Sequence, residues 1–403
     1  MDEPDFGSAL RSLHELAPSD IPDSLSSIAR RVGAYDMTIF LIDFEQSMLI
    51  PVPDRGVHVD SPIGVLATGT QEGQAFLERR LVATSVAGTT TTRVCVPVIE
   101  GSDCTGVLAF TLESAPVESA KRRFEELGMF VGAAISLGAR YTDLFNLVRR
   151  RRAMSLPASI QWDLLPPLRL KTQEATSNGV LEPAYDVGGD FFDHAANGFA
   201  IDLAIMDAMG HGLNSSLISS LAVGSYRHDR REGQPLAIIH QRLNDILYDR
   251  FGGDQFVTGQ LAKLDVQSGH ISWINAGHPL PLQVRAGRVL TKLDCKPSLP
   301  WGLGGQLVEE ADVALQPADS VIFYSDGVID GRGASGESFG IDRFIALIEE
   351  ALADPIPSDV AIRNAMNAVL DFQDRRLRDD ATVVWLTWHP PPGVSSGSAR
   401  LSS

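Results

Sequence analysis

The segment YDVGGDFFDH, residues 185–194, places two glycines directly before Asp190 and two aromatic residues directly after it. Glycine has no Cβ, so the chain at Gly188 and Gly189 can approach a ligand closely and can adopt positive φ. The letters GGD also suggest a nucleotide cyclase. That signature needs an acidic residue in fourth place, and Phe191 stands there instead, with no accompanying GTP-binding motif. The cyclase interpretation is therefore disfavoured.

Four more aspartates stand where strand-like runs begin or end. Asp207 ends FAIDLAIMD, Asp326 ends SVIFYSD, and Asp379 and Asp380 precede ATVVWLTW. Each one alone is typical of a turn, but carboxylates at the ends of apolar strands are costly unless they are paired or coordinated. Together they predict a shared site with bound cations. Oxygen ligands favour Mg²⁺ or Mn²⁺ over zinc, and two ions about 3.5–4 Å apart would balance the charge.

The composition limits the classes of partner. The 403 residues carry a formal net charge of −17, which argues against a nucleic acid or an anionic membrane as partner. Cys95, Cys104 and Cys295 are widely spaced and fit no zinc motif, and Cys95 and Cys104 are expected to pack in a core. The N-terminus has no signal-peptide pattern and no apolar run is long enough to span a bilayer. We expect a cytoplasmic protein.

The first part of the chain alternates helix and strand patterns. Residues 23–34 predict a helix, residues 36–43 a strand, and residues 91–100 and 104–113 a hairpin joined by a turn. A long helix is expected over 117–160, and the run Arg149 to Arg152 is expected to be a solvated or helix-terminal charge cluster. Apolar residues in this helix recur every 3.5 residues, at Val117, Ala120, Phe124, Leu127, Val131 and Ala134. That spacing fits either a coiled-coil seam in a homodimer or a face packed on its own domain.

The second part of the chain has the pattern of a larger domain. Strand patterns such as 256–265, 270–276 and 381–388 alternate with pairs of helical patterns at 213–228 and 235–250 and at 341–352 and 358–372. This order predicts an α+β protein with two packed sheets and helices outside them. The expected organisation is an N-terminal segment (1–20), a sensor domain (21–116), a linker helix (117–160), a second domain (161–389) and a disordered tail (390–403).

Five motifs in the second part of the chain resemble a known family when they are taken in order. YDVGGDFFD, IMDAMGHG, NAGHPLP, YSDGVIDG and DDATVVWL resemble the bacterial PPM (protein phosphatase 2C-like) serine/threonine phosphatases of the sporulation and stress-response branch. The resemblance covers roughly Pro157 to Trp388. It implies an α-β-β-α sandwich and hydrolysis of phosphoserine or phosphothreonine by a water that bridges two Mn²⁺ or Mg²⁺ ions. No phosphoenzyme is needed, and Ser325 has no base beside it to make it a nucleophile.

The resemblance also implies roles for single residues. Asp207 should bridge both metals, and the backbone carbonyl of Ala208 should be a further ligand. The other implied ligands are Asp326 and Asp379 for one metal, Asp190 directly or through water, and Asp380 as an additional candidate. His211 and His278 are expected to shape loops at the site, since His211 is not spaced from Asp207 like the histidine of eukaryotic relatives.

The first domain resembles a GAF sensor by its element order, with a PAS domain as the alternative. The resemblances together imply a phosphatase regulated by an unknown small-molecule or protein signal. Its implied substrate is a phosphorylated anti-sigma-factor antagonist. The alternative function is a non-catalytic sensor or scaffold with a decayed phosphatase domain, although all the expected aspartates are present.

Overall fold

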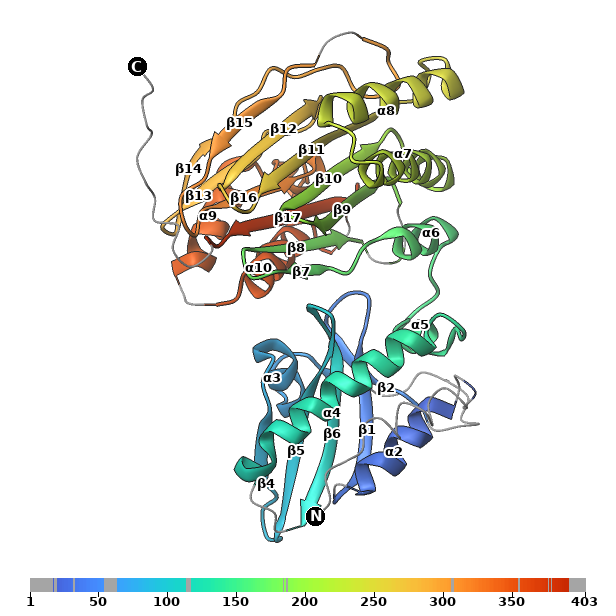
Figure 1. Cartoon of the computed structure of the whole chain (residues 1–403), viewed down its shortest axis with the longest axis vertical. Coiled ribbons are helices and arrows are strands. Elements are labelled where there is room, and N and C mark those ends of the chain that lie inside the picture. Colours follow the sequence, from blue (N-terminus) through green and yellow to red (C-terminus); the bar gives the residue numbers. More distant parts are fainter. Residues whose placement is uncertain are drawn as a thin grey trace. The chain divides into compact units, whose positions relative to one another are not determined.

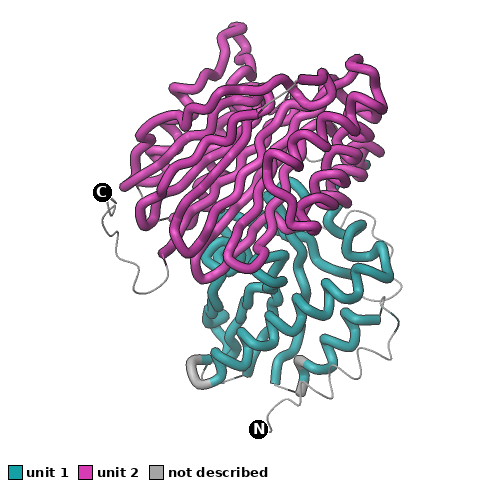
Figure 2. The backbone as a smooth tube through the Cα atoms, turned by 45° about the horizontal axis from the view of Figure 1, so that its top comes forward, with its two compact units in different colours: residues 1–153 teal, residues 154–403 magenta. Residues whose placement is uncertain are grey.

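The computed structural model describes residues 17, 20–31, 33–53, 64–113, 117–183, 185, 188–305, 308–353, 356–375, 377 and 379–390. The chain divides into two compact units, residues 1–153 and 154–403 (Figure 2). The expected N-terminal segment (1–20) and tail (390–403) lie almost wholly outside the described residues. No helix in the described part of the chain is both long and apolar enough to cross a membrane.

Unit 1 is built on one antiparallel sheet with the strand order β3-β2-β1-β6-β5-β4. The predicted helix over 23–34 and the predicted hairpin are confirmed as α2 and as the β5–β6 pair. Cys95 and Cys104 are buried in an apolar cluster on the sheet, as expected. The GAF assignment stays a prediction. The elements are α2 (Ile21–Arg31), β1 (Ala34–Ile42), β2 (Met48–Pro51), β3 (Val65–Leu66), α3 (Gln71–Glu78), β4 (Val82–Ser85), β5 (Thr91–Glu100), β6 (Asp103–Glu113), α4 (Val117–Gly138) and α5 (Leu144–Val148).

The 3.5-residue seam of α4 faces its own sheet. Its residues are buried in one cluster with side chains of β1, β5 and β6, which shows that the seam completes the core of unit 1. The coiled-coil interpretation of this seam is therefore wrong. The seam residues in the cluster are Ala120, Phe124, Leu127, Val131 and Ala134. The expected continuous helix over 117–160 is also wrong, because α4 ends at Gly138 and the shorter helices α5 and α6 (Leu156–Leu164) follow it.

The arginine run after α5 is tied to β1 and the turn that follows it. Arg149 Nε donates to the carbonyl of Ile42 at 2.9 Å. Arg151 Nη1 lies 3.4 Å from Asp43 Oδ2 and 3.2 Å from Glu45 Oε2. The run therefore fastens the end of unit 1 onto its own sheet and is more than a solvated charge cluster.

Two glycines let α4 lie unusually close to β5. A Cβ at Gly132 would collide with the carbonyl of Ile99, and one at Gly128 would collide with the carbonyl of Pro97. We expect Gly132→Val to destabilise unit 1 by about 2 kcal/mol, because the helix must move off the strand. The matched control is Ala133→Val, one residue along on the exposed side of α4. Hydrogen exchange at the β5 amides should quicken only in the glycine variant; equal exchange in both variants would contradict the close-packing account.

Unit 2 has four layers (Figure 1). One sheet has the order β14-β13-β16-β17-β8-β7 and the other β15-β12-β11-β10-β9. They bury a shared core between them, while α7 and α8 cover the five-stranded sheet and α9 and α10 cover the six-stranded sheet. The predicted α+β sandwich is confirmed. Its elements are α6 (Leu156–Leu164), β7 (Arg169–Lys171), β8 (Ala175–Glu182), β9 (Asp190–Asn197), β10 (Ala200–Ala208), α7 (Leu213–Arg231), α8 (Leu236–Phe251), β11 (Val257–Asp265), β12 (His270–Ala276), β13 (Leu282–Arg285), β14 (Arg288–Lys292), β15 (Ala311–Ala314), β16 (Ser320–Tyr324), the 3₁₀ helix η2 (Asp326–Val328), α9 (Ile341–Ala353), α10 (Ser358–Phe372) and β17 (Ala381–Trp388).

The boundary between the units differs from the expected one. α6 was expected at the end of a linker helix, yet it belongs to unit 2, which begins at Met154. Its start is capped by Ser155, whose hydroxyl accepts from the Ala158 amide at 3.2 Å, and it stops at Leu164 just before two prolines. The prolines were expected to end this helix, because proline cannot donate a backbone hydrogen bond. The short strand β7 and most of β8 were not expected from the sequence.

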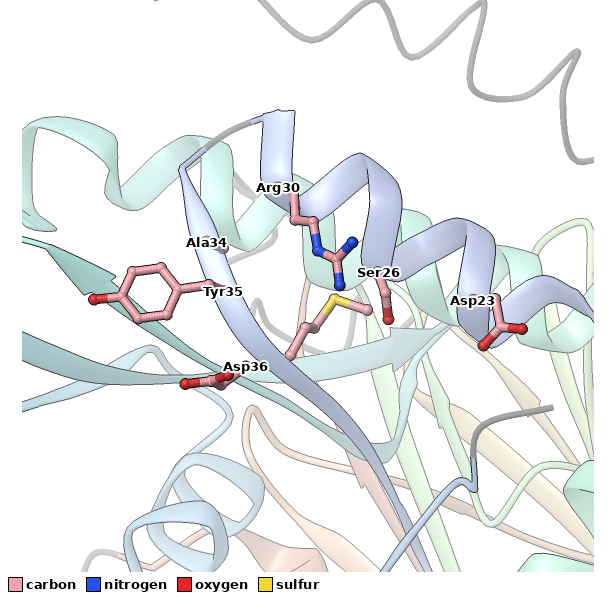
Figure 3. A pocket seen from close by; sticks show the side chains of 7 residues that line it. Asp23, Ser26, Arg30, Ala34, Tyr35 and Asp36 are labelled. Carbon is pink, nitrogen blue, oxygen red and sulfur yellow. The ribbon is translucent and has the colours of Figure 1, made fainter. Parts of the chain in front are cut away.

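A polar hollow of about 500 Å³ lies between α2 and β1 of unit 1 (Figure 3). The side chains of Ser26 and Arg30 extend from α2 toward β1. Asp36 adopts a φ of 52° beside an irregularity in the β1–β6 pairing, so the strand is locally distorted at the hollow. The lining residues are Asp23, Ser26, Arg30, Ala34, Tyr35, Asp36 and Met37.

Candidate active site

The five expected aspartates come from both sheets of unit 2. Asp190 is the first residue of β9 and Asp207 is near the end of β10, in the five-stranded sheet. Asp326 follows β16, and Asp379 and Asp380 precede β17, in the six-stranded sheet. Asp190 is paired with Asp207 in the β9–β10 ladder, and its amide is bonded to Asp380. Asp326 and Asp379 lie near enough to Asp207 to raise its pKa.

The strand register explains why Asp190 and Asp207 are neighbours. They are directly opposite each other in the β9–β10 pair. The Ala208 amide donates to the carbonyl of Gly189 at 3.2 Å, so the Gly189–Ala208 pair is the hydrogen-bonded one. Hydrogen-bonded and non-hydrogen-bonded pairs alternate in an antiparallel ladder. Asp190 and Asp207 therefore form a non-hydrogen-bonded pair, in which the side chains are closest and the peptide groups of Asp190 point away from β10.

Hydrogen bonds between the two sheets hold Asp190 and Asp380. Asp190 Oδ2 accepts from Ser325 Oγ at 2.7 Å and from Thr382 Oγ1 at 2.6 Å. Asp380 Oδ2 accepts from the amides of Gly189 at 2.6 Å and of Asp190 at 3.0 Å. Hydrogen bonds to a charged group contribute about 1.5–3 kcal/mol each. They fix the two carboxylates at the junction between β9 and β17.

Burial is the main cause of raised pKa values at the site. It raises the pKa of Asp207 to about 8, with repulsion from the neighbouring carboxylates adding to the shift. It raises the pKa of Asp190 well above its usual value, in part offset by the Ser325 and Thr382 hydroxyls. Burial raises the pKa of Asp380 to about 6, and the amides of Asp190 and Gly189 and the Gln161 side chain oppose that rise. A cluster in which every carboxylate resists ionisation favours positive charge.

The donor set suits hard divalent cations. Asp380 Oδ1 is buried and has no hydrogen-bond partner among the described residues. Carboxylate oxygens are the ligands that Mg²⁺ and Mn²⁺ prefer. In the described part of the chain no three His, Cys, Asp or Glu side chains are already arranged to hold an ion. One oxygen of Asp190, Oδ2, accepts hydrogen bonds from the Ser325 and Thr382 hydroxyls. The residue types therefore fit a divalent cation. For Asp190 to bind the cation through Oδ2, this oxygen must keep its hydrogen bonds while coordinating the ion, or the carboxylate must rotate.

The two glycines before Asp190 allow close packing. A Cβ at Gly188 would lie 2.6 Å from Ser216 Oγ and 3.0 Å from Pro157 Cβ, and one at Gly189 would lie 3.2 Å from the carbonyl oxygen of Ala208. Gly189 lies outside the positive-φ region, so the expectation of a positive φ is wrong at this position. The Ser216 hydroxyl donates to the carbonyl of Gly188 at 2.8 Å. The glycines thus let helices α6 and α7 press directly on the strand that carries Asp190.

The histidines occupy the loops as expected. His211 lies exposed between two positive-φ glycines. Burial raises the pKa of Asp379, and the Asp380 amide and the nearby His211 partly offset that rise. His278 is buried in a turn in which Asn275 bonds both its amide, at 2.7 Å, and its carbonyl, at 2.8 Å. Burial lowers the pKa of His278 to about 3, so it is neutral at physiological pH.

Three polar residues of the site were not predicted. Ser325 was considered only as a nucleophile, yet its hydroxyl donates a hydrogen bond to Asp190 Oδ2. Thr382 makes the second hydroxyl contact. Gln161 Nε2 donates to the carbonyl of Asp190 at 2.6 Å. The motifs YSDGVIDG and DDATVVWL contain Ser325 and Thr382. The contacts of the three residues with Asp190 span from 29 to 192 residues of chain, which local patterns do not encode.

Comparisons with known proteins identify a family for the second part of the chain. Residues 197–389 match the family model described as Stage II sporulation protein E (SpoIIE). This region is a SpoIIE-type phosphatase domain. The family is a branch of the protein phosphatase 2C class, so the resemblance noted in the sequence is confirmed for this region. The matched residues contain Asp207, Asp326, Asp379 and Asp380, whereas Asp190 and α6 precede them.

One curated relative is similar over more of the chain than the SpoIIE-type domain. The phosphoserine phosphatase RsbU of Bacillus subtilis (strain 168) is 23% identical over 270 residues, which are 65% of this chain and 79% of the relative. Two further curated relatives are matched over 34% and 22% of their own lengths.

Solved structures show the same similarity at low identity. The RsbU and RsbW domains of a Mycobacterium tuberculosis protein are 22% identical, with a TM-score of 0.47 over 56% of this chain and 63% of that one. The catalytic domain of the serine/threonine phosphatase PstP, solved with two manganese ions, is 13% identical, with a TM-score of 0.39 over 54% of this chain and 100% of that one.

Proposed function

We propose that the protein is a metal-dependent phosphatase that removes phosphate from phosphoserine or phosphothreonine of a protein. The supporting observation is the convergence of five aspartates at one end of a SpoIIE-type sandwich, with pKa values raised by burial and mutual repulsion. Perturbed carboxyls gathered at strand ends are a mark of a functional site. A purely structural cluster would carry the same repulsion without any benefit.

The aspartates would hold two Mn²⁺ or Mg²⁺ ions. Asp207 would bridge both ions, and the carbonyl of Ala208 would add a further ligand. The other ligands would be Asp326, Asp379 and Asp380, with Asp190 bound directly or through a water. When bound, such ions lower the pKa of a water and neutralise charge on the phosphoryl oxygens.

The protein's own groups hold the donors in place. Ser325 and Thr382 orient Asp190, and the amides of Gly189 and Asp190 orient Asp380. Because the Ser325 hydroxyl is buried and already donated, no side chain is poised as a nucleophile at this position. Direct attack by water on phosphorus, without a phosphoenzyme, is consistent with this arrangement.

The proposed substrate is a phosphorylated anti-sigma-factor antagonist. This rests on the resemblance to the stress-response branch and on the similarity to RsbU, which is itself a phosphoserine phosphatase. The proposed regulator is unit 1. Its polar hollow between α2 and β1 offers Arg30, Asp23 and Asp36 to a small polar signal. α6, which follows the unit boundary, contacts both Gly188 and Asp190 and could pass a change on to the site.

Hydrolysis of a phosphoserine protein tests the activity. The full chain with Mn²⁺ should release inorganic phosphate, and EDTA should stop the release. Unchanged hydrolysis in EDTA would overturn the metal mechanism. No turnover on any phosphoprotein, combined with tight partner binding, would favour the non-catalytic scaffold.

Comparing the full chain with a fragment of residues 154–403 tests regulation by unit 1. We expect the fragment and the full chain to differ in rate under at least one condition, since α6 would no longer be connected to unit 1. Equal rates under all conditions would argue against control by unit 1.

A further inference from the structure

The backbone of Asp190 has two outward-pointing groups that β10 cannot satisfy. β9 is the last strand of its sheet, and the pair Asp190–Asp207 is a non-hydrogen-bonded one, as the Gly189–Ala208 bond shows. The amide and the carbonyl of Asp190 therefore point away from the sheet. Asp190 is only 2% exposed, so both groups need a partner from the protein.

The two partners are side chains that lie far apart in the sequence, near the start and near the end of unit 2. The Asp190 amide donates to Asp380 Oδ2 at 3.0 Å. The Asp190 carbonyl accepts from Gln161 Nε2 at 2.6 Å. Gln161 lies on α6, before the residues that match the family model. Asp380 is itself a candidate ligand, and the Gln161 side chain also favours its ionised form.

The contact made by Gln161 leaves a buried polar atom unsatisfied, which is destabilising and points to a function for this side chain. Gln161 is 4% exposed, and its Oε1 is buried without a hydrogen-bond partner among the described residues. A buried polar atom left unsatisfied opposes folding. A leucine or methionine would avoid that cost but could not donate to Asp190. The Gln161 side chain thus leaves its Oε1 without a hydrogen bond while its Nε2 donates to the backbone of Asp190.

The helix that carries Gln161 is itself held on both sides. Pro157 packs against Gly188, where a Cβ would be too close. At its other end, the carbonyl of Leu164 accepts from Arg227 Nη2 at 2.6 Å, while Arg227 Nε donates to Asp193 Oδ2 at 2.6 Å. Asp193 lies three residues after Asp190 on the same strand. α6 and β9 are therefore joined at two points, which fixes Gln161 relative to Asp190.

We propose that Gln161 is a positioning residue that sets the backbone of Asp190, so that cation affinity at the site depends on a helix outside the SpoIIE-type region. The inference rests on the proposed function, since it takes the aspartates as cation ligands. Removing a hydrogen-bond partner behind a metal ligand typically weakens metal affinity or activity by about 10–100-fold. A residue that only filled space would not change affinity selectively.

Gln161→Met tests the proposal in the full chain, because methionine keeps the volume and loses the donor. The matched control is Gln260→Met. Gln260 is also a buried glutamine whose Nε2 donates to a backbone carbonyl, that of Pro279, which is not a candidate ligand. Mn²⁺ affinity is measured from the electron paramagnetic resonance signal of free Mn²⁺, and the Tm of the metal-free chain reports folding. Phosphate release is measured against Mn²⁺ concentration.

We expect Gln161→Met to raise the Mn²⁺ Kd about 10–100-fold, and the lost rate to recover as Mn²⁺ is raised. Gln260→Met should change the Tm of the metal-free chain by about as much as Gln161→Met does, and it should leave the Mn²⁺ Kd within twofold of wild type. An unchanged Kd in Gln161→Met, or equal weakening in both variants, overturns the proposal. If Gln161→Met does not fold, Gln161→Leu, which also has no donor, must show the same weakening. A wild-type chain that binds no Mn²⁺ overturns the proposed function as well.

Discussion

Asp207→Asn should abolish phosphate release and, at the same time, stabilise the metal-free protein. Asparagine has the shape of aspartate but no charge, so it cannot bridge two cations, and we expect turnover to fall at least about 10³-fold. The same change removes a carboxyl whose pKa is raised to about 8 by burial and by its neighbours. At pH 8 this relief should contribute about 2 kcal/mol, or roughly 4–8 °C in the Tm of unit 2.

The two effects of Asp207→Asn have opposite signs, which separates them from general damage. The control is Asp312→Asn, an exposed aspartate on β15 whose side chain is 65% accessible, and which should change neither quantity. Wild-type turnover in Asp207→Asn would contradict the proposed ligand set. Lost turnover with a lower metal-free Tm would contradict the account of mutual repulsion.

The metal-free protein should lose stability as the pH rises from 6.5 to 8. The folded-state pKa of Asp207, about 8, lies above the unfolded value of about 3.9. The folded state therefore holds the proton more tightly, and its advantage disappears as the pH rises through the folded pKa. Below pH 6.5 the buried histidines act in the opposite direction, because burial lowers the pKa of His278 to about 3 and that of His194 to about 4. Between pH 6.5 and 8 the change in stability therefore reports mainly on the buried aspartates.

Mn²⁺ should reverse this pH dependence. A ligand at 100 times its Kd stabilises the folded state by about 2.7 kcal/mol, so Tm at pH 8 should rise by roughly 5–10 °C. All five tryptophans lie at or after Trp162, so tryptophan fluorescence follows unit 2 alone. The Mn²⁺ shift should be absent in Asp207→Asn. A metal-free Tm that rises between pH 6.5 and 8 would refute the role assigned to the carboxyl cluster.

Much of the fold could be predicted from local patterns. The β5–β6 hairpin, the paired helices α7–α8 and α9–α10, and the final strand β17 have clear apolar periods and turn signals, and all are present. The positions of the five aspartates beside strand ends also sufficed to predict their convergence. These features depend on residues that are close in sequence or on strand ends that a sandwich necessarily brings together.

The errors come from contacts whose partner lies far along the chain. A 3.5-residue period shows that α4 has an apolar face but not what covers that face, and its own sheet does so. Gly188 and Gly189 were expected to provide backbone freedom, whereas they make room for Pro157, Ser216 and Ala208. The partners of Asp190 could not be assigned for the same reason. The residues were visible in the sequence, but their distance in space was not.

The closed edge of β9 restricts how a protein substrate can approach. An exposed strand edge is a template on which an extended peptide can add as a further strand. At Asp190 both edge groups are already occupied, by Gln161 and Asp380. A substrate segment therefore finds no free backbone ladder at this point of the site. We therefore expect recognition to depend on the surface surrounding the phosphorylated residue rather than on strand addition at Asp190.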